Sequence, residues 1–198
     1  MDCYAAPATG KDRVLGAALR LFAERGFDRV TIRDIGLAAG FTNPALYRHY
    51  RGKEELGLDL YRRCYKRMVS TLRGLEGTGR NPLDKLVGYV PAIVGLYEAD
   101  PFVVQYVDEH QVRFWPELRH EFEPDTLSSI LARWVRQGQK AGSIRTDISV
   151  EGLTALPLGL VTQWLAMRSA KLCVTADTDE LESLVRSAVS SSTRTLKG

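Results

Sequence analysis

Apolar residues recur along most of the chain at the three- and four-residue steps that place them on one face of a helix. The first such stripe comprises Val14, Leu15, Ala18, Leu19, Phe22 and Ala23. Gly26 ends this helix. Thr31 then stands at an N-cap position with Asp34 three residues later, which predicts a second helix that Gly40 stops after about two turns.

A third, short helix is predicted over about residues 43–50, because Thr42 suits an N-cap and Pro44 suits the first turn. After a short break, a longer helix runs from Lys53 to about residue 72. A polar stretch with several glycines over residues 74–82 then forms the clearest boundary in the chain.

The pattern beyond this boundary is also helical. Further helices are predicted over about residues 83–98, 102–113, 117–141, 150–172 and 179–196. Thr178 is the predicted N-cap of the last helix, and residues 142–147 read as a turn. No convincing alternation of β-branched residues appears, so the sequence predicts an all-α fold of about nine helices.

Two short helices separated by Gly40 and Phe41 have the arrangement of a helix-turn-helix, in which the first helix braces the second at a steep angle. Ala39, Phe41 and Leu46 would form the small core between them. The residues that the second helix would expose are Asn43, Ala45, Tyr47, Arg48 and His49. This mixture is typical of a recognition helix that enters the major groove of DNA.

Five segments in this part of the chain carry a resemblance to a known family. They are residues 22–27 (FAERGF), 31–35 (TIRDI), 39–42 (AGFT), 46–50 (LYRHY) and 53–56 (KEEL). In their order and spacing they resemble the TetR family of bacterial transcriptional regulators. The resemblance implies an N-terminal three-helix helix-turn-helix DNA-binding domain, followed by a helical ligand-binding and dimerisation domain.

Two positions depart from the family's usual pattern. Gly36 stands where alanine is usual, which lowers the helix propensity of the second helix by about 1 kcal/mol. Tyr50 replaces the more usual phenylalanine, so its hydroxyl needs either a hydrogen-bond partner or an exposed edge.

The resemblance also assigns roles to single residues. Positions that match DNA-backbone contacts are Thr42, Tyr47, His49 and Lys53, and Thr31 and Arg33 would add contacts from the bracing helix. Residues that would face base edges are Asn43, Ala45 and Arg48, and the most variable part of this reading surface is Asn43, Pro44 and Ala45. The residue types alone leave alternatives open: Tyr47 and Tyr50 also suit a core, His49 a plain surface position, and Arg33 and Lys53 solvated charges.

The distribution of charge supports a polyanionic partner for the first third of the chain. The net charge is +3, but residues 1–74 contain 14 Lys and Arg against 8 Asp and Glu, a net +6. The remaining residues contain 13 against 16, a net −3. Together with the resemblance, this predicts a flexible arm (1–10), a helix-turn-helix DNA-binding domain (11–56) and an effector-binding and dimerisation domain (57–198), with 57–74 as the connecting helix.

The second domain is expected to hold the effector pocket and the dimer surface. Residues chosen as pocket lining, because their helices correspond to those around the family's pocket, are Tyr106, His110, Trp134, Gln163 and Trp164. Residues that offer an apolar stripe on the last two helices are Leu153, Leu156, Leu160, Leu181, Leu184, Val185, Ala188 and Val189. These stripes suit either a homodimer or a core within one chain. The predicted effector is a small, largely apolar molecule, and no cofactor is expected.

Two other classes of function remain as alternatives. Glu117 and His120 stand one helical turn apart, as in helical metal-dependent enzymes, but such a site needs a second pair of this kind and further glutamates. A helical protein-binding adaptor would leave the basic first third unexplained. The three cysteines have no zinc-site spacing and the apolar stretch 153–167 is short for a membrane span, so we expect a cytoplasmic protein that binds no membrane.

Overall fold

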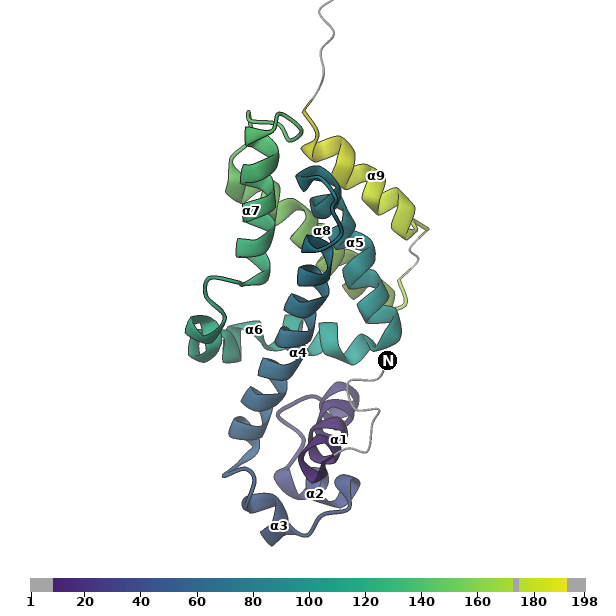
Figure 1. The fold of residues 1–198 in the computed structure, drawn as a ribbon. Coiled ribbons are helices and arrows are strands. Elements are labelled where there is room, and N and C mark those ends of the chain that lie inside the picture. Colours follow the sequence, from purple (N-terminus) through teal and green to yellow (C-terminus); the bar gives the residue numbers. More distant parts are fainter. Residues whose placement is uncertain (1–8, 173–174, 192–198) are drawn as a thin grey trace, which may run out of the picture. The chain divides into compact units, whose positions relative to one another are not determined.

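The computed structural model describes residues 9–172 and 175–191, and nine α-helices lie within these ranges (Figure 1). They are α1 (Gly10–Arg25), α2 (Ile32–Ala39), α3 (Asn43–Tyr47), α4 (Lys53–Glu76), α5 (Pro82–Ala99), α6 (Pro101–Phe122), α7 (Leu127–Lys140), α8 (Val150–Ser169) and α9 (Thr178–Val189). The predicted all-α fold is confirmed. Most of the arm expected over residues 1–10 lies outside the described residues, as do Cys3 and Cys173. The last helix, expected to run to about residue 196, ends at Val189, with Ser190 as its C-cap.

Threonine and aspartate side chains begin the first two helices. The Thr31 hydroxyl accepts a hydrogen bond from the Asp34 amide, and the Asp34 carboxylate accepts one from the Thr31 amide. Thr9 and Asp12 form the same capping box at α1, so Thr9 and Gly10 belong to the helix start rather than to an arm. Each box satisfies two amides that have no partner within the helix.

The N-cap of the last helix differs from the predicted one. Asp177, rather than Thr178, caps α9, and its carboxylate accepts a hydrogen bond of 2.9 Å from the Glu180 amide. Thr178 is the first residue of the helix. Aspartate and threonine are both good N-cap residues, so local propensity does not distinguish the two registers.

A larger difference lies at Pro116, where the sequence predicts a break between two helices. Instead α6 continues from Pro101 to Phe122, and the break falls between Phe122 and Leu127. A proline inside a helix removes one backbone hydrogen bond and crowds the preceding turn. Phe114 and Leu118, on either side of Pro116, are both buried. Their packing outweighs the local preference of proline for a break.

The described residues form two compact units. The N-terminal unit lies within Met1–Arg67 and Leu96–His120, and the C-terminal unit lies within Met68–Gly95 and Glu121–Gly198. The N-terminal unit thus combines α1, α2, α3 and the first part of α4 with most of α6. The sequence places residues 96–120 in the second domain, whereas the structure groups them with the helix-turn-helix.

The most apolar stretch of the chain, residues 153–167, lies within α8. Its residues Leu153, Val161 and Leu165 are buried. No single helix in the described ranges is both long and apolar enough to cross a membrane, and the bent pair of α5 and α6 meets that test only when both are counted together.

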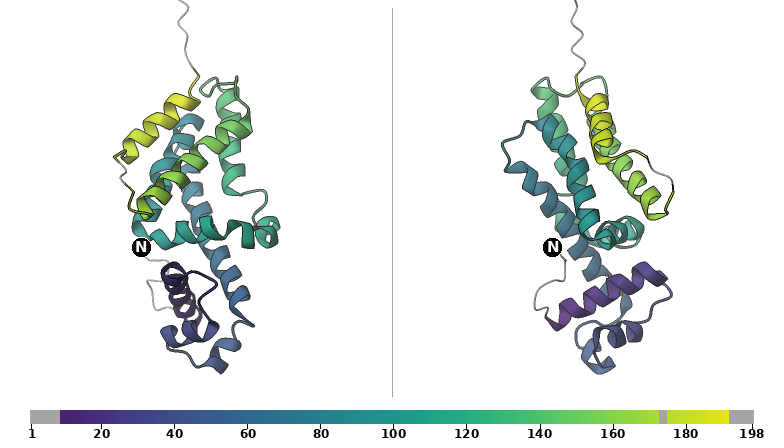
Figure 2. Two further views of the ribbon diagram at one scale, coloured as in Figure 1. Left: turned by 180° about the vertical axis from the view of Figure 1, so that it is seen from behind. Right: turned by 90° about the vertical axis from the view of Figure 1, so that its right-hand side faces the viewer.

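The helices α7, α8 and α9 lie side by side in the C-terminal unit, and the turn after α7 joins them (Figure 2). Ile144 in this turn is buried and pairs with Ser190 in an isolated antiparallel bridge. Its amide donates a hydrogen bond to the Gly138 carbonyl. A Cβ atom at Gly138 would lie 2.4 Å from Cδ1 of Ile144, so glycine permits this close approach.

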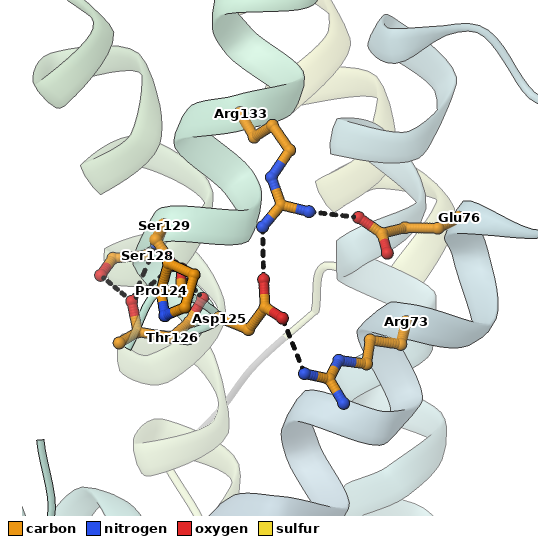
Figure 3. Close-up of polar contacts among 8 residues, drawn as sticks. All are labelled: Arg73, Glu76, Pro124, Asp125, Thr126, Ser128, Ser129 and Arg133. Atoms are coloured by element: carbon orange, nitrogen blue, oxygen red, sulfur yellow. Dashed lines mark hydrogen bonds and ion pairs between the residues drawn. The ribbon is translucent and has the colours of Figure 1, made fainter. Parts of the chain in front are cut away.

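An ion-pair network joins the loop before α7 to the end of α4 (Figure 3). The Asp125 carboxylate accepts hydrogen bonds from both Arg73 and Arg133, and Arg133 also contacts Glu76 at 3.1 Å. The two guanidinium groups hold the pKa of Asp125 below its ordinary value. Next to it, Thr126 caps α7 by accepting a hydrogen bond of 3.0 Å from the Ser129 amide. The start of α7 is thereby fixed within the C-terminal unit.

We expect Gly138→Ala to lower the free energy of unfolding by about 1–3 kcal/mol, because the added methyl group overpacks against Ile144. Denaturant titration followed by circular dichroism measures the change. The control is Gly74→Ala, which adds a methyl group to a helical glycine with no atom in reach. It should leave stability unchanged or raise it by up to about 1 kcal/mol. Equal effects of the two substitutions would contradict the packing at Ile144.

Candidate nucleic-acid interface

The helix-turn-helix is built from α2, a tight turn and α3. Gly40 takes the left-handed conformation, with φ 72°, and ends α2. The Phe41 amide then donates a hydrogen bond of 2.8 Å to the Gly36 carbonyl, which turns the chain toward α3. Ala39 and Leu46 are buried between the two helices, as the sequence predicts, and Phe41 is half-buried. A small apolar core therefore braces α3.

The surface of α3 and its flanks is exposed. The exposed side chains are those of Thr42, Pro44, Tyr47, Arg48 and His49. Ala45 is half-buried, and the side chain of Asn43 lies outside the described part of the structure. Thr42 stands at the N-cap of α3 but makes no side-chain capping hydrogen bond. Its hydroxyl is thus not committed to the helix.

Three of the sequence-predicted contact residues lie on the flanks of this surface. Arg33 is exposed on α2, whereas the Thr31 hydroxyl is engaged in the capping box. The Lys53 ammonium donates hydrogen bonds to the carbonyls of Phe27, at 2.9 Å, and Asp28, at 3.3 Å. It also lies 4.7 Å from the centre of the Phe27 ring. Lys53 therefore supports the turn after α1, a role that the sequence pattern did not indicate.

Tyr50 is buried, in contrast to the exposed rings of Tyr47 and His49 near it in the sequence. Its side chain is 3% exposed, and its hydroxyl donates a hydrogen bond of 2.8 Å to the Asp59 carboxylate. The partner that the tyrosine requires is thus present on α4. Burial and the adjacent carboxylate raise the pKa of the Tyr50 phenol, so it stays protonated.

The residues that support Tyr50 form a charged cluster that the sequence analysis missed. Asp59 pairs with Lys11 at 3.0 Å, and Arg63 joins Asp59 to Asp12 at the start of α1. Burial acts to raise the pKa of Asp59, but hydrogen bonds from Tyr50 and Lys11 hold it below its ordinary value. The spacing of Asp59 and Arg63, four residues apart on a predicted helix, was the available signal.

Aromatic side chains join α6 to the helix-turn-helix within the N-terminal unit. Phe27 lies between Phe22, His110 and Phe114, with ring centroids 4.6, 5.4 and 5.7 Å away. Tyr106 stacks on Phe22, and its hydroxyl donates a hydrogen bond to the Gly57 carbonyl on α4. At the rim, the Arg113 guanidinium contacts the Asp28 carboxylate at 3.1 Å.

The five residues predicted to line an effector pocket are divided between the two units. Tyr106 and His110 belong to the aromatic packing of the N-terminal unit. Trp134, Gln163 and Trp164 belong to the C-terminal unit, where Trp134 is buried and Gln163 is exposed. The Trp164 indole donates a hydrogen bond of 3.3 Å to the Ala176 carbonyl. These residues were chosen by helix order, and their role in effector binding stays a prediction.

Comparison with known proteins connects this geometry with a family of regulators. A family model described as bacterial regulatory proteins, tetR family, matches residues 14–60, from α1 to the first part of α4. The HTH-type transcriptional repressor KstR2 of Rhodococcus jostii is 30% identical over 169 residues, which cover 80% of this chain and 78% of that protein.

Solved structures share the fold over almost the whole chain. A TetR family transcription regulator from Marinobacter aquaeolei superposes with a TM-score of 0.77 at 19% identity, covering 91% of this chain and 95% of that one. The ketosteroid transcriptional regulator KstR2 of Mycobacterium tuberculosis gives a TM-score of 0.71 at 20% identity, covering 92% and 96%. At these identities the likeness shows the fold alone.

We expect Tyr50→Phe to lower the free energy of unfolding by about 1.5–3 kcal/mol, because it removes a hydrogen bond to a charged carboxylate. Tyr47→Phe is the matched control, since it deletes the hydroxyl of an exposed tyrosine three residues away and should change stability by less than about 0.5 kcal/mol. Urea titrations of the two variants measure both values. A Tyr50→Phe protein as stable as the wild type would contradict the role of Asp59.

His110 predicts a dependence of stability on pH. Burial among the rings lowers the pKa of His110 below its ordinary value of 6.5, and Arg113 adds to this effect. The unfolded chain therefore takes up the proton more readily, so stability is full above about pH 6.5 and falls as the pH drops toward the folded-state pKa. His110→Gln should flatten the loss of melting temperature between pH 7.5 and 5.5. His49→Gln, which replaces an exposed histidine, is the control and should leave the pH dependence of the melting temperature unchanged. A wild-type pH dependence in His110→Gln would contradict this account.

Proposed function

Because this chain belongs to the TetR family of bacterial transcriptional regulators, we propose that it is a ligand-responsive repressor that binds a palindromic operator as a homodimer. The family is one of DNA-binding regulators, not of enzymes. The observation that carries the proposal is the exposed surface formed by Tyr47, Arg48 and His49 on a helix-turn-helix whose small apolar core is buried. Relatives that are named repressors support repression rather than activation.

The side chains at the interface divide into two groups by their chemistry. Thr42 and Tyr47 offer hydroxyls, and His49 a ring nitrogen, to phosphate oxygens, and these contacts fix the register on the duplex. Arg33 adds a contact from α2. Lys53 has one N–H donor left beyond its bonds to Phe27 and Asp28, and Thr31 contributes by capping α2 through its side chain. We assign the base edges to Arg48, Asn43 and Ala45, with Pro44 in the variable part of the same surface. An arginine at a base edge favours guanine.

A dimer is needed because two recognition helices must reach half-sites about 34–36 Å apart. We assign the dimer contact to α8 and α9. In one chain Leu153, Leu181, Val185 and Val189 are already buried, whereas Leu184 is 50% exposed. Leu156 and Leu160 are half-buried on α8. The stripe therefore serves the core of each chain and leaves part of its apolar surface for a second copy.

The effector is a small, largely apolar molecule that binds in the C-terminal helices and releases the operator. Aromatic side chains such as Trp134 suit an apolar ligand, and one structural relative is described as a ketosteroid regulator. A ligand changes DNA affinity only through its own preference between the two states of the protein. Regulation of this kind takes place in the bacterial cytoplasm.

Fluorescence anisotropy with labelled DNA from upstream of the chain's own gene tests the function, at two salt concentrations and with an unrelated duplex as control. We expect preferential binding that weakens steeply with salt, with a slope near −0.9 per phosphate contact. No binding even at low salt would contradict the DNA-binding assignment of residues 42–53. A protein-binding adaptor would show no such preference.

Arg48→Ala separates the two groups of contacts in the same assay. We expect it to cost about 1–3 kcal/mol on the operator and to relax the preference at one base pair. Tyr47→Phe should instead weaken binding to all duplexes about equally, since a phosphate contact carries no sequence information. If Arg48→Ala weakened binding to all duplexes equally, Arg48 would be a phosphate contact and not a base contact.

A further inference from the structure

A crevice of about 400 Å³ lies within the N-terminal unit, between α1, α2 and the corner where α5 ends and α6 begins. This volume is within the usual range for small-molecule sites. Neither the predicted effector residues nor the exposed face of α3 line it. The crevice is therefore separate from both sites proposed above.

The crevice is lined by two carboxylates that are already paired and by two arginines. Its two carboxylates already have partners that do not line it: Asp12 pairs with Arg63, and the buried Asp100 pairs with Arg67 at 3.1 Å. Its two cations are Arg13 and Arg20. With both carboxylates neutralised by outside arginines, the crevice is electropositive.

Arg13 and Arg20 stand three residues before and four residues after Gly16 on α1, so they lie on one face of the helix and line the same side of the crevice. Arg13 lies over the Phe41 ring, 5.1 Å from its centre. Arg20 is exposed, and the described residues provide it with no hydrogen bond or ion pair. Its five N–H donors are therefore available to a ligand.

The rest of the lining is apolar. Leu19 is buried on α1, and Pro101 and Phe102 begin α6 on the opposite side. Ala38 and Ala39 of α2 complete the wall with small side chains. A flat hydrocarbon body fits such a lining better than a fully hydrated ion, because it buries apolar surface on both sides.

We infer that this crevice binds a small amphipathic organic anion, with an aromatic or alicyclic body between Leu19 and Phe102 and a carboxylate or sulfonate on Arg20 and Arg13. Arginine is suited to this task because its planar group holds an anionic head group with two parallel hydrogen bonds. A cation would meet two arginines and two carboxylates that are already paired. The ligand would touch α1 and α2, the helices that support the recognition helix.

The test titrates the full chain, without DNA, with the fluorescent anion 8-anilinonaphthalene-1-sulfonate. We expect saturable binding, weakened at least about five-fold by Arg20→Gln, which removes one charge pair. Ala99→Phe should weaken it by a similar factor or more, because Ala99 is exposed and lines the crevice, where a phenyl ring takes the place of the ligand. The neutral analogue N-phenyl-1-naphthylamine should bind more weakly, and Arg20→Gln should leave its affinity unchanged.

Matched controls distinguish the crevice from other places where the dye can bind. Arg29→Gln removes the same charge from an exposed residue outside the lining, and Ala141→Phe adds the same ring at the exposed end of another helix. Both should keep the wild-type affinity, with folding of every variant checked by circular dichroism. Failure of the dye to bind saturably, or binding that Arg20→Gln and Ala99→Phe leave unchanged, would overturn the assignment.

Discussion

The N-terminal unit depends on the packing of one ring, that of Phe27. Phe22 on α1 and His110 and Phe114 on α6 contact its faces and edge, while Lys53 and Arg113 lie over it at 4.7 and 4.5 Å. The contact requires glycine on α4, because a Cβ at Gly57 would lie 2.6 Å from the Phe27 ring and 2.9 Å from Phe114. Phe27 thus sets how closely α1, α4 and α6 approach one another.

This packing also holds the backbone behind the surface that we propose reads DNA. The helix α4 that approaches Phe27 at Gly57 also carries Asp59, which holds Tyr50 through its hydroxyl. Tyr50 follows directly after the exposed residues Arg48 and His49. The backbone behind the proposed reading surface is therefore anchored on α4 by a buried tyrosine, while the side chains of Arg48 and His49 stay exposed.

Sequence patterns predicted local features well where the signal is local. The capping box of Thr31 and Asp34, the left-handed Gly40 and the buried Leu46 follow from residue type and spacing alone. The need of Tyr50 for a partner was also evident, but not that Asp59 would supply it. Pro116 was misinterpreted because its local preference gives way to the packing of Phe114 and Leu118. The orientation of Tyr106 and His110 likewise depends on a partner far away in the sequence.

The chain crosses between the two units inside helices. Each crossing point lies within α4, α5 or α6 and not in a loop. The crossing points are Arg67/Met68, Gly95/Leu96 and His120/Glu121. A fragment that ends after α4 would lack α6 and expose the rings of Phe22, Phe27 and Tyr61 to water. The DNA-reading part is therefore not a portable module, and transplanting it to another sensor requires two separate stretches of chain.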